Sequence, residues 1–166
     1  MIKQTVLESM DKQIMHELYS AYFYLSMSAH CESANLPGFA TWLRVQAQEE
    51  QGHAMKIYDY ILDRGGKVTL QAIAQPPVDF TSPLDIFKQV YEHEQKVTGL
   101  INAIYDLALA EKDVASQICL QWFITEQVEE EKNASQILDT LNKIGSSVGS
   151  LYQLDHRLGK RGGGED

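Results

Sequence analysis

The sequence has little that would suit a secreted, membrane or nucleic-acid-binding protein. Its 166 residues include two cysteines, Cys31 and Cys119, whose spacing fits neither a metal knuckle nor a disulfide framework. There is no run of about eighteen uncharged apolar residues, and charges interrupt the N-terminus before a signal-peptide core. Lys and Arg number 14 against 23 Asp and Glu, a net charge of −9. We therefore expect a cytoplasmic protein with no membrane or nucleic-acid partner.

Proline and glycine are also scarce within the periodic parts of the chain. Apolar residues recur there at alternating spacings of three and four, which predicts helices, and no strand-like alternation competes. Residues that typically start or end helices separate these segments and predict four helices of nearly thirty residues. The start signals are Thr5-x-x-Glu8, Pro37-Gly38, Ser82-Pro83 and Asp113, and the stop signals are Gly65-Gly66 and Gly145.

The connections between the four segments predict how they pack. Tight turns near Asn35 and Lys112 make the first two and the last two helices antiparallel, whereas residues 67–82 are long enough to span a helix when extended. The second and third helices can then run parallel. We predict an all-α four-helix bundle with one long crossover, a short fifth helix over Val148–Leu158, a single domain over 1–159, and a disordered tail over 160–166.

Each predicted helix carries an acid in the middle of its inner face. Glu94 lies in register between Val90 and Val97, and Glu50-x-x-His53 interrupts the apolar stripe of the second helix. Counted from the turns, Glu17 and His53 differ in height by roughly 3 Å at about 1.5 Å per residue, and Glu94 and Glu130 are level. The inner positions therefore gather five groups at mid-bundle: Glu17, Glu50, His53, Glu94 and Glu130.

Buried carboxylates need a compensating cation. A lone Glu-x-x-His pair arises often by chance, but several acids at one height cost several kcal/mol each unless metal or protons neutralise them. No Lys or Arg occupies these inner positions. Oxygen-rich ligation with one imidazole suits iron or manganese better than structural zinc. The donor set exceeds the needs of one ion, so we predict two metals, with Glu50 able to bridge them.

Four motifs resemble those of the bacterial and archaeal non-haem ferritins, over about Leu7 to Leu158. They are Glu-Leu-Tyr-Ser-Ala-Tyr (17–22), Arg44-Val-Gln-Ala-Gln-Glu-Glu-x-x-His53, Tyr91-Glu-His-Glu94 and Gln121-Trp-Phe-Ile-Thr-Glu-Gln-Val-Glu-Glu-Glu131. The carboxylate pattern is a recognised template of ferritin-like di-iron bundles. The resemblance implies a ferritin-like fold, which agrees with the four-helix bundle with one long crossover that the spacing predicts.

The resemblance also implies a set of site residues. Glu17, Glu50 and His53 would form a first iron site, and Glu50, Glu94 and Glu130 a second. A third, weaker iron site would use Glu49, Glu126, Glu129 and Glu130, with Tyr24 and Gln127 close to the di-iron pair. Ferritins assemble as 24-subunit hollow shells, so the resemblance implies a homo-oligomer in which the short fifth helix lines channels.

The implied function is iron storage with ferroxidase activity, in which dioxygen oxidises ferrous iron at the di-iron centre. Haem is not expected, because Gln51 stands where bacterioferritins place the haem-ligating methionine, and Gln127-x-x-Glu130 replaces their second Glu-x-x-His. Two alternatives remain open. One is a passive iron container without fast oxidation, and the other is a DNA-protecting mini-ferritin.

Overall fold

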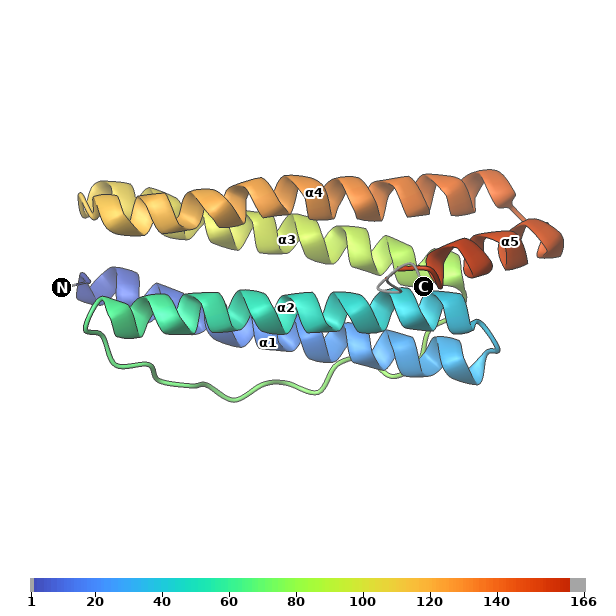
Figure 1. The fold of residues 1–166 in the computed structure, drawn as a ribbon, viewed down its shortest axis with the longest axis horizontal. Coiled ribbons are helices and arrows are strands. Elements are labelled where there is room, and N and C mark those ends of the chain that lie inside the picture. Colours follow the sequence, from blue (N-terminus) through green and yellow to red (C-terminus); the bar gives the residue numbers. More distant parts are fainter. Residues whose placement is uncertain (1, 162–166) are drawn as a thin grey trace.

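The apolar spacing produces helices where it predicts them. The computed structural model describes residues 2–161, which form α1 (Gln4–Ser33), α2 (Pro37–Asp63), α3 (Pro83–Ala110), α4 (Val114–Ile144) and α5 (Val148–Leu158). The four long helices lie side by side and α5 folds back from the end of α4 (Figure 1). No strand occurs between residues 2 and 161. The predicted all-α bundle with a short fifth helix is confirmed.

Most of the predicted helix ends are confirmed by their hydrogen bonds. Ser82 Oγ accepts from Asp85 N at 3.1 Å at the start of α3, and Asp113 Oδ1 accepts from Ser116 N at 3.3 Å at the start of α4. Gly65 and Gly145 end α2 and α4 with positive φ, a conformation that costs glycine little.

The predicted capping box at the start of α1 is wrong. The helix begins at Gln4, and the residue that precedes it, Lys3, makes no side-chain cap hydrogen bond within residues 2–161. Thr5 Oγ1 instead donates to Glu111 at 3.0 Å, beyond the end of α3. A long-range partner therefore takes the hydroxyl that the local motif would have used.

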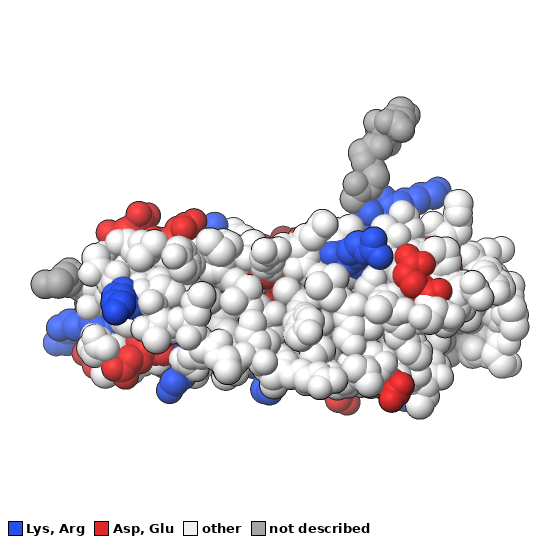
Figure 2. All heavy atoms as spheres, turned by 90° about the horizontal axis from the view of Figure 1, so that it is seen from below, with Lys and Arg blue, Asp and Glu red and all other residues white. Residues whose placement is uncertain are grey.

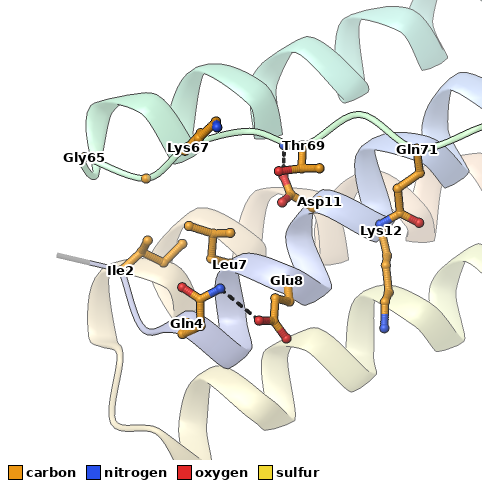
Figure 3. Close-up of a pocket in the computed structure, with 11 residues that line it drawn as sticks. Ile2, Gln4, Leu7, Glu8, Asp11, Lys12, Gly65, Lys67, Thr69 and Gln71 are labelled. Carbon is orange, nitrogen blue, oxygen red and sulfur yellow. Dashed lines mark hydrogen bonds between the residues drawn. The ribbon is translucent and has the colours of Figure 1, made fainter.

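The long connection between α2 and α3 lets these two helices run parallel. It follows the bundle from one end to the other alongside α1 and α2 (Figure 1). Asp11 of α1 accepts from Thr69 N at 3.1 Å (Figure 3), and Ser26 Oγ, also of α1, donates to Pro77 O at 2.5 Å. The crossover is therefore held to α1 at two points along its length.

The interior of the bundle contains two separate apolar clusters. One surrounds Phe39, Leu43 and Phe87, at the end where α5 packs. The other surrounds Met10, Ile57 and Ile101, at the opposite end, and it contains the first half of α1 and the second half of α2. The inward-facing acids occupy the space between these clusters.

The short helix α5 is docked against the start of α2. Asp155 Oδ1 accepts from Phe39 N at 2.9 Å, which satisfies a backbone donor in the first turn of α2. A Cβ on Gly38 would lie 1.7 Å from the backbone oxygen of Asp155, so this approach requires glycine. Beyond α5, Arg161 contacts Glu49, and the rest of the predicted tail, 162–166, lies outside the described residues.

One face of the bundle is largely uncharged. Figure 2 views the side along which the crossover runs, and its charged residues gather toward the two ends and the edges. Exposed apolar side chains from α1 and the crossover occur here: Tyr22, Leu25, Ile73 and Val78. Of the helices in the described part of the chain, none has the length and apolarity that crossing a membrane requires.

Candidate metal centre

Residues from all four long helices meet between the two apolar clusters. α1 supplies Glu17, α2 supplies Glu50 and His53, α3 supplies Glu94, and α4 supplies Glu130. Each is at most 6% exposed, although such charged groups are ordinarily found at the surface. The regular rise of the helices and the tight turns bring these residues to one height, as their spacing predicts.

Glu17, Glu50 and His53 form the first compact group. His53 Nδ1 lies 3.5 Å from Glu50 Oε2 and 4.0 Å from Glu17 Oε2, and one ligand atom from each of the three residues lies within 4.8 Å of the others. Two carboxylates and one imidazole nitrogen thus converge on a single point from α1 and α2. This is a donor set that iron or manganese favours.

The opposite side of the His53 ring faces α4. His53 Nε2 lies 3.9 Å from Glu126 Oε1, and His53, Glu126 and Glu130 form a second group within 4.8 Å. The side chain of Glu126 is 29% exposed, so this group connects the buried layer with the surface. The family motifs imply Glu126 only for a third site, whereas here its carboxylate reaches the imidazole of the first.

Glu94 enters the layer from α3 with both carboxylate oxygens hydrogen bonded. The phenol of Tyr24, itself fully buried, donates to Oε1, and Gln127 Nε2 donates to Oε2 at 3.1 Å. Gln127 Nε2 also lies within hydrogen-bond distance of the Glu94 backbone oxygen and of Thr98 Oγ1. Tyr24 and Gln127 are therefore placed to fix the Glu94 carboxylate.

Burial and mutual repulsion make this layer retain protons. Burial, and then the charge of Glu50, raise the pKa of Glu17 well above its usual value. The same causes raise the pKa of Glu94 to about 8 and that of Glu130 to about 7. Burial lowers the pKa of His53, but the hydrogen bond to Glu50 and the nearby carboxylates outweigh it and raise this pKa to about 9.

Two features of the layer point to a bound cation. Glu17 Oε2, the oxygen that faces His53, is buried and has no hydrogen-bond partner in the described part of the chain. Across residues 2–161, no Lys or Arg pairs with Glu17, Glu50, Glu94 or Glu130. A buried unpartnered carboxylate oxygen is costly, and a metal ion would satisfy it directly. The residues present therefore fit a metal site.

The outer acids are less closely gathered. Glu49 and Glu129 are exposed, and Glu49 Oε2 lies 2.5 Å from Arg161 Nη2. The charge of Glu49 still contributes to the raised pKa of Glu130, so these two carboxylates lie close enough to interact. Of the third-site residues implied by the family motifs, only Glu126 and Glu130 share a compact group.

Two glutamines support the site without having been predicted. Gln13 Nε2 donates to Glu17 Oε1 at 2.7 Å, and Gln46 Nε2 donates to Glu50 Oε1 at 2.8 Å. Each glutamine precedes its glutamate by four residues, a spacing that places both on one helix face. That spacing is visible in the sequence and would have identified both residues.

Comparisons with known proteins agree with this geometry. A sequence model of the ferritin-like domain matches residues 7–144. The chain is 40% identical to a bacterial non-haem ferritin of Bacteroides fragilis over 97% of its own length and all of that protein, and 37% identical to one of Staphylococcus aureus, with 97% of both chains covered.

Solved structures give the same result for the fold. An open-pore ferritin of the archaeon Archaeoglobus fulgidus superposes with a TM-score of 0.96 at 45% identity, covering 97% of this chain and 99% of that one. A humanized archaeal ferritin superposes with a TM-score of 0.97 at 44% identity, covering 99% and 100%. The matched length, the identity and the shared fold show that this chain belongs to the ferritin family.

Proposed function

We propose that the chain is an iron-storage ferroxidase that oxidises ferrous iron with dioxygen at the mid-bundle acid layer. The observation that carries this proposal is the buried set Glu17, Glu50, His53, Glu94 and Glu130. Among residues 2–161 this set has no partner Lys or Arg, and one of its carboxylate oxygens has no hydrogen-bond partner. Membership of the ferritin family supports iron as the metal. Iron is here the substrate and the cargo.

Each residue has a distinct role in this proposal. Glu17 and His53 Nδ1 hold a first ferrous ion, Glu94 and Glu130 hold a second, and Glu50 bridges the two. Tyr24 and Gln127 orient Glu94 through their hydrogen bonds, as Gln13 and Gln46 orient Glu17 and Glu50. Rigid helices fix these groups before iron arrives, so little reorganisation is needed.

The chemistry balances with dioxygen as the oxidant. Two ferrous ions each give up one electron, dioxygen takes up both electrons and two protons, and hydrogen peroxide leaves. Carboxylates favour the ferric products because they are hard anionic ligands. Entry of iron displaces the protons that Glu94 and Glu130 hold near neutral pH, so the layer exchanges protons for metal.

Storage requires assembly, and we propose a 24-subunit shell built from copies of this chain. The uncharged face of Figure 2 supports burial against another copy, because exposed apolar area of this kind favours association.

We propose that Glu49, Glu126, Glu129 and Glu130 hold a third, weaker iron that leaves the centre through the half-buried Glu126. Haem has no part in the proposal. The free thiols of Cys31 and Cys119 suit a cytoplasmic location.

Aerobic loading of the metal-free protein with ferrous iron tests storage and chemistry together. We expect hundreds of irons per particle, eluting from gel filtration at the volume of a large shell, and about one dioxygen consumed per two irons at low loading. Two irons per chain in a small oligomer would contradict storage. Full loading with no fast phase, and no loss of rate in Glu50→Ala, would identify a passive container instead.

A further inference from the structure

A second site candidate lies away from the acid layer, in an open pocket of about 610 Å³ bordered by α2, α4 and α5. Three cations line it: Lys143 from the last turn of α4, Arg157 from the last turn of α5, and Arg161 just beyond α5. One carboxylate, Asp139, accompanies them. On a chain with a net charge of −9, a pocket with three cations and one acid is a marked local reversal of charge.

Two of these cations have no anionic partner among the described residues. Lys143 and Arg157 are exposed, and among residues 2–161 neither forms an ion pair. Asn133, Gln136 and Thr140 of α4 line the same pocket with amide and hydroxyl groups. The pocket therefore combines free positive charge with neutral hydrogen-bond donors.

The third cation, Arg161, is fixed in place but incompletely satisfied. Its Nη2 contacts Glu49, and its guanidinium stacks on the ring of Trp42 with 4.3 Å between the guanidinium carbon and the ring centroid. Its Nη1 is buried and, among residues 2–161, has no hydrogen-bond partner. The hydrogen-bonding capacity of this guanidinium is therefore not used up by Glu49, and its positive charge favours an anion in the pocket that it lines.

We propose that this pocket binds a tetrahedral oxyanion, inorganic phosphate, between Lys143, Arg157 and Arg161. Phosphate at neutral pH carries one to two negative charges and several acceptor oxygens, which match two guanidinium groups and an ammonium. Binding at this pocket requires neither iron nor its oxidation. The inference is thus independent of the proposed ferroxidase activity.

The same cations have another physical role from which the site must be separated. Lys143 is in the last turn of α4 and Arg157 in the last turn of α5, where positive charge also favours the helix dipole. If this were their only role, neutralising them would lower thermal stability and leave phosphate binding unchanged.

Calorimetric titration of the metal-free, assembled protein with inorganic phosphate at low salt tests the proposal. We expect one saturable phosphate per chain, weakened about tenfold or more in Lys143→Gln and in Arg157→Gln, because each change removes a charged partner. Lys132→Gln is the matched control: it makes the same charge change on α4 outside the pocket, and it should stay within about twofold of the unmodified protein.

A second readout uses Trp42, which lies in the pocket. The chain has two tryptophans, so a Trp122→Phe background isolates the fluorescence of Trp42, and phosphate should change it with the same midpoint as the calorimetry. Sulfate should compete, and chloride at equal ionic strength should compete far less.

Four results would overturn the proposal. They are the absence of saturable binding at millimolar phosphate, unchanged binding in both pocket variants, equal weakening in the Lys132→Gln control, and binding of adenosine monophosphate without binding of free phosphate. Gel filtration of each variant establishes that the assembly is intact, and thermal unfolding reports any loss at the helix ends.

Discussion

The two ends of the bundle and its middle are built on opposite principles. At the ends, aromatic and aliphatic side chains such as Phe87 and Ile101 are almost completely buried and need no polar partner. In the middle, acids of all four long helices share a buried layer with one histidine. Burial of apolar surface at the ends stabilises the folded state, whereas burial of charged groups in the metal-free middle destabilises it.

This contrast teaches that stability and chemistry occupy different parts of one core. The apolar clusters on either side hold the helices in register, and this register keeps the acids together against their repulsion. The stability of a folded protein is a small difference between large opposing contributions, mainly apolar burial and conformational entropy. The destabilising acid layer is therefore tolerated because the apolar clusters on either side of it are well packed. Substitutions in the two kinds of region should therefore have separable effects.

The largest effect should come from an apolar end. Phe87 is fully buried and packs against Phe39 and Trp42, so Phe87→Ala should lower the free energy of unfolding by about 3–5 kcal/mol through lost burial and a cavity. Denaturant unfolding of the metal-free protein measures this cost. Wherever the variant remains folded, the oxidation rate per folded chain should change little, and a collapse of that rate would contradict the separation of roles.

The next effect should come from the middle and appear in the chemistry. Glu50→Ala removes the proposed bridging carboxylate, so the initial rate of ferrous oxidation should fall by on the order of 100-fold or more. Stopped-flow absorbance during the first two irons per chain measures it. The metal-free variant should unfold at the same or a higher temperature than the parent, because one buried acid is gone. A large loss of stability would mean that Glu50 is mainly structural.

The pH dependence of stability should distinguish the two regions further. The folded-state pKa values of Glu94 and Glu130, about 8 and 7, lie above the ordinary glutamate value, so folding favours their protonated forms. Stability contributed by these protons is complete below the ordinary value near pH 4.5 and is lost as pH rises through 7 and 8. His53, with its pKa raised to about 9, acts in the same direction between about pH 6.5 and 9.

Unfolding temperatures of the metal-free protein should therefore fall by several degrees between pH 6 and pH 9. Glu130→Gln should show a shallower fall, because one of the titrating acids is removed. Loading with ferrous iron under anaerobic conditions should release protons at pH 7 and remove most of the fall, since metal replaces the protons. A flat profile for the metal-free protein would contradict the raised pKa values.

The smallest effect should separate two acids on one helix. Glu126 lies 3.9 Å from His53, and Glu129, three residues later, is exposed. We expect Glu126→Gln to slow the oxidation of the first two irons by less than about tenfold, and Glu129→Gln to change it by less than about twofold. Rates measured at two and at three irons per chain check this. The reverse order would contradict a role for Glu126 beside His53.

Much of the middle layer could be predicted, because the number of residues from a turn gives the position of a side chain along the helix axis. Glu17, Glu50, His53, Glu94 and Glu130 each interrupt an apolar stripe, and a fixed rise per residue with short turns is enough to align them. The caps at Ser82 and Asp113 were predictable for a similar reason, since their hydrogen bonds join residues three apart.

The remaining details depend on contacts between residues far apart in the chain. Thr5 bonds Glu111 instead of capping its own helix, and Arg161 crosses to Glu49, so neither partner is visible in the local pattern. The direction of Glu126 toward His53 depends on the rotation of α4 against α2, which spacing along a single helix does not fix. Long-range placement of side chains is thus the information that periodicity lacks.

The docking of α5 has a consequence for the order of folding. The hydrogen bond from Phe39 N to Asp155 joins positions 116 residues apart, and Gly38 allows α5 to approach the start of α2 closely. Closing so long a loop costs conformational entropy before the contacts that it allows can form. We therefore expect α5 to dock after the helical hairpins α1–α2 and α3–α4 have formed. During synthesis the backbone donor in the first turn of α2 therefore lacks its partner, Asp155, until residues 148–158 have left the ribosome. The docked α5 then covers that end of the bundle.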